Sequence, residues 1–230
     1  MISGRRAILA ELYYKSGSVS FEPRRLSAHQ TDPDLPLSPF YLHYPEHGRR
    51  ALLLPALHHL VGRLFYEDAR EKELTFDRIG AVPKGAQPLA RAHARRYDGY
   101  PDNLITFQKA VVEDENEYDV DDGILNNRTT LLVNEDHTSG GHNAVRFLDV
   151  VRWYGATVTD YQIVVDRQQG GRERLAAAGV QMHGLITATE LLDYYVHVEH
   201  IDMATADRCM TYIADNQLWA PTAGGAVDIR

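Results

Sequence analysis

Residues Leu131 to Gly141 read Leu-Leu-Val-Asn-Glu-Asp-His-Thr-Ser-Gly-Gly. The apolar beginning predicts a buried strand, and the Thr-Ser-Gly-Gly end predicts a tight turn into a helix that begins near His142. Glycine tolerates a positive φ and lets the backbone approach a ligand closely. A helix start presents unpaired N–H groups and a positive dipole end, which together favour a phosphate. With acidic side chains just upstream to accept hydrogen bonds from sugar hydroxyls, this stretch supplies parts for binding a phosphorylated ribose.

Strands and helices alternate on both sides of this stretch. The predicted strands cover residues 79–82, 104–107, 130–135, 158–165 and 182–186, and the predicted helices cover residues 52–66, 88–97, 142–154, 172–178 and 202–218. Thr187 and Glu190 have capping-box spacing for one more helix. Alternating β and α units imply a parallel sheet that is covered by helices on both faces and binds ligands at the carboxyl ends of its strands.

Three motifs resemble a known family and occur in that family's order. The turn at residues 138–141 looks like the phosphoribosyl pyrophosphate (PRPP) motif of type I phosphoribosyltransferases. Residues 164–175, Val-Val-Asp-Arg-Gln-Gln-Gly-Gly-Arg-Glu-Arg-Leu, resemble the strand-end signature of orotate phosphoribosyltransferases, especially the form found in uridine monophosphate synthases. Residues 76–90 resemble the family's pyrophosphate-loop region. Together the motifs cover about residues 76–192, and three of them in order are a far more specific signal than one Gly-Gly turn.

The resemblance implies a fold and a division of the chain. We expect an α/β type I phosphoribosyltransferase fold, with a central parallel sheet flanked by helices and a small N-terminal lobe. Residues 1–70 would form this hood-like lobe over the base, and residues 71–230 would form the phosphoribosyltransferase core with the C-terminal helices. The resemblance also implies a homodimer.

The implied activity is that of an orotate phosphoribosyltransferase-like enzyme in pyrimidine nucleotide synthesis. It would transfer the phosphoribosyl group of PRPP to orotate or a related base, and Mg²⁺ would enter bound through PRPP rather than at a metal site of the protein. The alternative is a catalytically degenerate relative that binds PRPP or a nucleotide as a regulatory or partner protein. This type of fold carries both catalysts and regulators, so the fold alone does not choose between them.

The acidic residues at the strand end can be aligned in two ways. Without a gap, Asn134 and Glu135 take the positions where the family has two adjacent carboxylates that hold the ribose hydroxyls. A slip of one residue makes Glu135 and Asp136 the pair instead. All three are therefore candidates for the ribose of PRPP, and the resemblance implies a catalytic role for Glu135 and Asp136.

The turn that follows is the candidate cradle for the 5′-phosphate. Thr138, Ser139, Gly140 and Gly141 offer hydroxyl and backbone N–H groups to a phosphate. The simpler interpretation is an ordinary turn from a strand into a helix, which also favours serine and glycine. His137 stands where relatives usually carry an apolar residue; it is a further candidate for PRPP, although an exposed loop histidine is the plainer interpretation.

The base is expected to meet Arg167 and Thr138. In orotate enzymes the matching arginine contacts the base, and its planar fork suits a carboxylate or an imide edge. A surface ion pair between arginine and aspartate is the simpler alternative. Phe40 and Tyr41 belong to a Ser-Pro-Phe-Tyr segment that faintly resembles the family's aromatic cover over the base.

The pyrophosphate region contains the largest departure from the family. Lys84 and Gly85 match the pyrophosphate loop, where a lysine suits a polyanion as a point charge. Active relatives also carry a mobile basic loop, but residues 113–122 here are mostly Glu and Asp. Lys109 alone is retained as a catalytic candidate. Because like charges oppose the build-up of charge on pyrophosphate, the acidic run favours the degenerate alternative.

Composition excludes several other classes of protein. The chain has 230 residues and a net charge of -8, which argues against a general nucleic-acid surface. Cys209 is the only cysteine, so an intrachain disulfide is impossible and a reducing compartment fits. The sequence has no apolar run long enough to cross a bilayer and no secretory signal at its start. We therefore expect a cytoplasmic protein that binds neither nucleic acid nor membrane.

Overall fold

The computed structural model describes residues 2–26, 29, 33–43, 53–83, 85–112 and 115–218. Helices and strands follow one another as α1 (Gly4–Ser16), β1 (Val19–Ser20), β2 (Tyr41–Leu42), α2 (Leu54–Glu71), β3 (Arg78–Ala81), α3 (Gln87–Ala94), β4 (Leu104–Val112), β5 (Glu115–Asp122), β6 (Leu131–Thr138), α4 (His142–Trp153), β7 (Asp160–Asp166), α5 (Gly171–Ala177), β8 (Gln181–Thr187), α6 (Ala188–His197) and α7 (Met203–Asp215). The predicted alternation of strands and helices is confirmed, and so is the capping box of Thr187 and Glu190.

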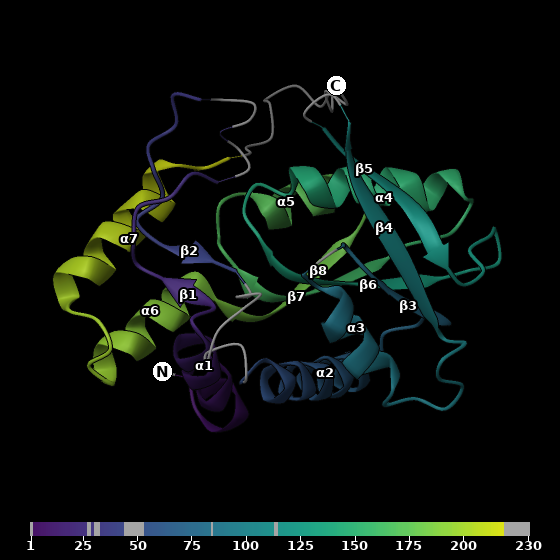
Figure 1. The fold of residues 1–230 in the computed structure, drawn as a ribbon, viewed down its shortest axis with the longest axis horizontal. Helices are drawn as coiled ribbons and strands as arrows, with labels where there is room; N and C mark the ends of the chain where they lie inside the picture. Colours follow the sequence, from purple (N-terminus) through teal and green to yellow (C-terminus); the bar gives the residue numbers. More distant parts are fainter. Residues whose placement is uncertain are drawn as a thin grey trace.

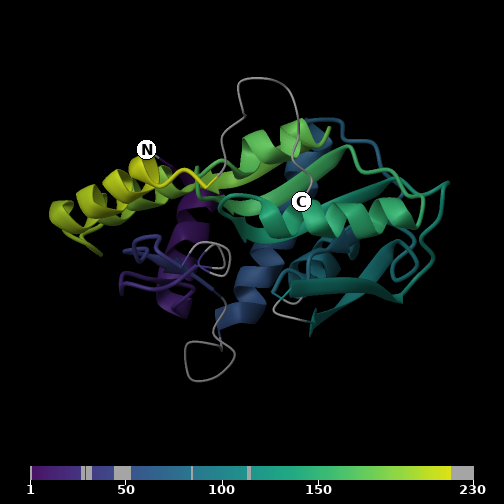
Figure 2. The same cartoon turned by 90° about the horizontal axis from the view of Figure 1, so that it is seen from above.

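A six-stranded sheet in the order β5-β4-β3-β6-β7-β8 forms the centre of the molecule (Figure 1). Helices α2 and α3 lie on one face of it, and α4 and α5 lie on the other (Figure 2). Side chains of β6 alternate between the two faces, as the pleat requires. Leu132 packs in the cluster that contains α2 and α3, whereas Val133 packs in the cluster that contains α4. This arrangement confirms the α/β class.

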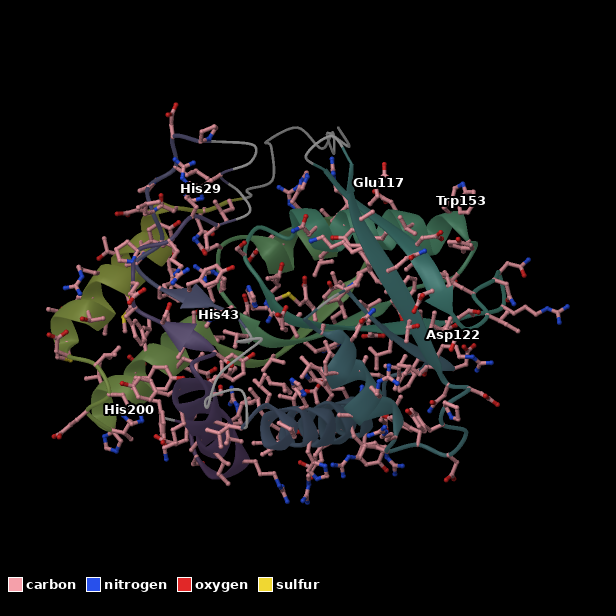
Figure 3. The ribbon with its side chains drawn as sticks, in the orientation of Figure 1. His29, His43, Glu117, Asp122, Trp153 and His200 are labelled. Carbon is pink, nitrogen blue, oxygen red and sulfur yellow. The ribbon has the colours of Figure 1, made fainter. Side chains whose placement is uncertain are left out.

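The sheet is mixed, so the expectation of a wholly parallel sheet is wrong at one edge. The neighbouring strands β4, β3, β6, β7 and β8 pair in parallel, but the edge strand β5 runs antiparallel to β4. The sequence predicted a four-residue strand and a polar loop here, because the segment is rich in acids. In fact the acids of β5 alternate with Tyr118, whose ring packs 5.6 Å from that of Phe147 on α4. Figure 3 shows Glu117 and Asp122 on this edge hairpin, and the period of two identifies the strand that composition concealed.

The N-terminal segment packs against the last two helices. Helix α1 was not predicted, because Ile8 is 54% exposed while Ser16 is fully buried, so hydrophobicity does not mark its buried face. Arg6 donates to the Leu185 carbonyl at 2.7 Å and pairs with Glu190 at 2.8 Å. Tyr195 on α6 donates to the Ala10 carbonyl at 2.9 Å. The segment α1-β1-β2 therefore shares one hydrophobic cluster with α6 and α7. From here on we call this segment, rather than residues 1–70, the N-terminal lobe.

Helices α2 and α3 cross at Gly62, and this crossing has a testable consequence. A Cβ atom at Gly62 would lie 2.5 Å from the carbonyl carbon of Ala92. The variant Gly62→Val is expected to lose at least about 2 kcal/mol of unfolding free energy, because overpacking of a tight contact forces the backbones apart. Urea unfolding measures this loss, with Ala56→Val on the exposed side of α2 as the control. An unchanged urea midpoint for Gly62→Val would contradict the crossing.

Within the described part of the chain, no helix is both long enough and apolar enough to span a bilayer.

Candidate functional site

Two strand-to-helix turns meet at the carboxyl ends of β6 and β7. Gly141 and Gly170 precede α4 and α5 with φ values of 74° and 97°, in the region that favours glycine. A Cβ atom at Gly171 would lie 2.6 Å from the Ser139 carbonyl oxygen, so the two turns touch. The backbone N–H of Arg167 donates to the Thr138 carbonyl at 3.2 Å. The predicted phosphate turn, Thr138 to Gly141, thus lies beside the predicted base residue Arg167 and at the start of α4.

The segment that follows α7 covers this turn. A Cβ atom at Gly140 would lie only 2.6 Å from the Cβ atom of Leu218. The backbone N–H of Leu218 donates to the Gln169 carbonyl at 3.0 Å, and Gln217 donates to the Gln168 carbonyl at 3.1 Å. A phosphate that approached Gly140 from this side would have to displace Leu218. The sequence carries no signal for this contact, since 78 residues separate its two members.

Arg167 is a buried cation. Its side chain is 1% exposed, its Nε donates to Gln169 at 3.0 Å, and its Nη2 donates to the Ser38 hydroxyl at 3.0 Å. Its Cζ lies 4.0 Å from the centroid of the Phe40 ring. Its Nη1 is buried and has no hydrogen-bond partner among the described residues. Burial lowers the pKa of Arg167 to about 10, so the guanidinium is still charged at neutral pH.

The surface ion pair considered for Arg167 is wrong. Asp166 pairs instead with Arg172, whose Nη2 lies 2.9 Å from the Asp166 carboxylate. Among the described residues, all neighbours that contact the Arg167 guanidinium are neutral: an amide, a hydroxyl and a ring. A buried charge needs a compensating partner, and a carboxylate ligand would supply one.

Phe40 and Tyr41, the two aromatic residues predicted to cover the base, have different surroundings. Phe40 is buried and faces the guanidinium of Arg167. Tyr41 is half-buried, and its ring lies 5.9 Å from Cζ of Arg24 and 5.4 Å from the ring of His43. The structure thus brings Phe40 into direct contact with Arg167, while the ring contacts of Tyr41 are with Arg24 and His43.

Asn134 is fully buried beneath α2 and α3. Its amide oxygen lies 3.0 Å from Nδ1 of His93, and its amide nitrogen donates to Gln162 at 3.3 Å. Gln162 in turn donates to Asp68 of α2 at 2.8 Å. This amide network attaches the helices to the sheet, so the predicted contact of Asn134 with ribose stays a prediction that its position does not support. Burial lowers the pKa of His93 to about 4, which keeps the imidazole neutral in this network.

Glu135 lies on the opposite face of β6 from Asn134. It is 7% exposed and accepts a hydrogen bond of 2.9 Å from the hydroxyl of Tyr161. Burial, together with the nearby charge of Asp136, raises the pKa of Glu135 to about 8 against the opposing effect of the Tyr161 bond. Glu135 is therefore largely protonated at neutral pH.

Asp136 is more exposed than Glu135, the other carboxylate among the three candidates. Burial raises its pKa, but His137 more than offsets this through its charge, its side chain and its backbone N–H, so the pKa of Asp136 ends below its usual value. The backbone N–H of His137 donates to Asp136 at 2.9 Å, and Nδ1 of His137 lies 3.4 Å from the other oxygen. Burial, the charge of Arg24 and the charge of His137, in this order of size, lower the pKa of His43, which is labelled in Figure 3. His43 therefore lies near His137. The N-terminal lobe therefore reaches the end of β6.

The residues predicted for pyrophosphate are only partly described. Lys84, Glu113 and Asp114 lie outside the described residues, and Gly85 is exposed in the turn before α3. Lys109 lies in β4, opposite Tyr118 of β5, so it belongs to a hairpin rather than to a loop. In the part of the chain that the structure covers, no three His, Cys, Asp or Glu side chains form a group that could hold a metal ion.

No family model matches the chain. The orotate phosphoribosyltransferase of Aquifex aeolicus is 31% identical over 136 residues, which are 58% of this chain and 73% of that protein. This chain belongs to the orotate phosphoribosyltransferase family.

Two further comparisons give a lower identity over a larger part of the chain. The uridine 5′-monophosphate synthase of Bos taurus is 28% identical over 162 residues, which are 70% of this chain. The chain spans 33% of the length of that bovine protein. The structure of the Leishmania donovani UMP synthase superposes with a TM-score of 0.70 at 21% identity and covers 92% of this chain and 43% of that one. That likeness shows a shared fold.

Several residues of the site could not be found from the family motifs. Ser38 and Gln169 hold Arg167, and Tyr161 holds Glu135. Gln169 does lie within the strand-end signature and Ser38 lies next to the aromatic segment, but nothing in either motif says that they share one guanidinium. Tyr161 had no signal of its own, since it is one apolar residue in a buried strand.

Proposed function

We propose that this chain is an orotate phosphoribosyltransferase. In the reaction the bond from ribose C1 to the pyrophosphate oxygen breaks, and a bond from C1 to a ring nitrogen of the base forms. The nitrogen gives its proton to water, and pyrophosphate leaves with the electron pair of the broken bond. The observation that carries the proposal is Arg167, a buried cation with one unpartnered nitrogen among the described residues, beside the turn from Thr138 to Gly141.

The base is proposed to be an anion such as orotate. Its carboxylate would accept hydrogen bonds from Arg167, because a guanidinium fork matches a carboxylate in geometry and charge. Phe40 would hold the guanidinium from one side, as it does in the structure at 4.0 Å. A neutral base such as uracil offers no charge to balance the buried cation and is expected to be a poor substrate.

The other groups are proposed to position PRPP. The hydroxyl and N–H groups of Thr138 to Gly141 would bind the 5′-phosphate, which requires Leu218 to move away from Gly140. Asp136 would accept hydrogen bonds from the ribose hydroxyls, since it is the ionised carboxylate at the strand end. Lys84 and Lys109 remain the proposed contacts to pyrophosphate. Such positioning, with stabilisation of developing charge, accounts for most of the rate that a site of this kind can provide.

Mg²⁺ is proposed to enter with PRPP and to be held by ligand oxygens, with Asp136 as the nearest protein carboxylate along β6. When bound, the ion would offset the negative charge of pyrophosphate. The proposal also includes a homodimer, as the family resemblance implies, and a cytoplasmic location, which the single cysteine of the chain favours. The acids Glu117 and Asp119 of β5 are exposed on either side of the buried Tyr118, so the strand that carries them is fixed against α4 with its charges in solvent.

Release of pyrophosphate from PRPP tests the proposal. With Mg²⁺ present, orotate is expected to give sustained release, whereas uracil and a sample without base give none. The double variant Thr138→Val with Ser139→Ala should lose both PRPP binding and turnover, because the hydroxyls that face the phosphate are gone. Thr75→Val, in an exposed loop, is the control. Binding of PRPP without turnover on any base would contradict the proposed enzymatic activity and favour the alternative of a degenerate relative that only binds PRPP.

A further inference from the structure

A basic pocket lies on the outer side of the α2 and α3 layer, away from the sheet. Its volume is about 720 Å³, within the range of about 300–1,000 Å³ that small-molecule sites occupy. Helix α3 buries Leu89, Ala90 and His93 toward the sheet, whereas Arg91 and Arg95 are exposed on its other side. The pocket therefore lies in a different helix layer from the Thr138 to Gly141 turn that begins α4, although Gln87 and Pro88 of its lining follow closely after Gly85.

The charge of this pocket is opposite to that of the chain as a whole. Its lining includes His58, His59, Arg91, Arg95 and Arg96, and no Asp or Glu, although the chain carries a net charge of -8. The three guanidinium groups repel one another in a lining that has no Asp or Glu among the described residues, which costs free energy unless an anion binds. Clustering of this kind in an acidic protein points to a ligand.

The three arginines have neutral partners in the part of the chain that the structure covers. Nη2 of Arg96 lies 3.1 Å from Nε2 of His59, and Cζ of Arg95 lies 5.3 Å from the centroid of the Tyr100 ring. Hydrogen bonds from Arg95 and Arg91 lower the pKa of Tyr100, which places all three groups together. No ion pair of the described residues includes Arg91, Arg95 or Arg96. These contacts orient the guanidinium groups and leave their charge uncompensated.

We propose that this pocket binds a small molecule with two or more phosphate groups, of the class of a nucleoside diphosphate. Guanidinium forks bind phosphate oxygens in pairs, and three of them can neutralise more than one phosphate. Pro55, Pro88 and Ala92 offer an apolar surface for the ring of such a ligand, and Gln87 completes the lining. This site is distinct from the Thr138 to Gly141 turn and from Arg167, because its residues belong to α2, α3 and the turn after α3.

Amide NMR of the whole chain tests this proposal residue by residue, with ADP as the probe. Titration of ADP is expected to shift the amides of residues 58–59 and 91–96. In the variant Arg95→Gln with Arg96→Gln the affinity read from these shifts should fall about tenfold or more, because charge-assisted hydrogen bonds are lost. The matched control is Arg63→Gln with Arg70→Gln, which removes two exposed arginines of α2 that do not line the pocket.

Several outcomes overturn the proposal. Shifts confined to residues 138–142 would assign ADP to the candidate active site alone. Equal affinities for the two double variants would show that total charge, not the pocket, attracts ADP. Shifts in residues 58–59 and 91–96 on raising the protein concentration without ADP would assign the pocket to a contact between two copies of this chain. If the first double variant does not fold, Arg91→Gln serves the same purpose, and the wild-type shift map already decides the location.

Discussion

Replacing Arg167 by glutamine is expected to lower kcat/KM for orotate by about two to three orders of magnitude. The side chain is buried, charged and faces only neutral groups in the described structure. In water a single charged hydrogen bond counts for little, but in a site that excludes water it is much stronger. Glutamine can still donate a hydrogen bond, so the loss isolates the effect of the charge.

Steady-state kinetics with orotate, and titration of PRPP alone, measure the effect of Arg167→Gln. Binding of PRPP should persist, because the Thr138 to Gly141 turn is intact. The urea midpoint should change little, since the lost packing under Phe40 is offset by removal of an unpaired buried charge. Arg152→Gln, at the end of α4, is the control and should leave all three quantities unchanged. Equal losses of PRPP binding and turnover would contradict a role for Arg167 at the base.

Glu135→Gln is expected to stabilise the protein at alkaline pH. The ordinary pKa of this carboxyl is 4.5, and in the folded protein it is about 8. Between these values the unfolded chain releases a proton that the folded chain keeps, so wild-type stability falls as pH rises through this window, by about 1.4 kcal/mol per pH unit at most. Glutamine does not ionise and still accepts the bond from Tyr161. The variant should therefore exceed the wild type by several kcal/mol at pH 8 and by little near pH 5.

Urea unfolding at pH 5.5 and pH 8.0 measures this difference. Glu173→Gln, on the exposed first turn of α5, is the matched control, because its carboxyl stays in water in both states. Parallel stability curves for Glu135→Gln and the wild type would mean that Glu135 is ionised in the folded protein. In that case Glu135 would join Asp136 as a charged candidate for the ribose.

The parts of the fold that were predictable are those fixed by local sequence. The strand, turn and helix around Gly141, and the capping box of Thr187, depend on residues within a few positions of one another. Helix α1 and strand β5 escaped prediction because tertiary packing decides them. A fully buried Ser16 and an exposed Ile8 contradict the usual pattern, and the acids of β5 concealed its alternation with Tyr118.

The candidate site divides along the same line. The turn from Thr138 to Gly141 is local, and sequence predicts both its shape and its suitability for phosphate. The environment of Arg167 is not local, because Ser38 reaches it from 129 positions away. For Asn134, the sequence shows its place in the motif but not its hydrogen-bond partners. Its amide bonds His93 and Gln162, which come from distant parts of the chain.

The N-terminal lobe packs on α6 and α7, so this packing cannot form until both helices have been synthesised. The hydrogen bonds from Arg6 to Leu185 and from Tyr195 to Ala10 each join residues at least 179 positions apart. At ribosomal rates of about 5–20 residues per second, the partners of α1 emerge roughly ten to forty seconds after it. Until then α1, which buries Leu9 and Tyr13 in the finished protein, can pack on α2 but not on α6. The lobe that brings Phe40 to Arg167 is therefore synthesised before the helices on which it closes, so the site is completed only after α6 and α7 have been made.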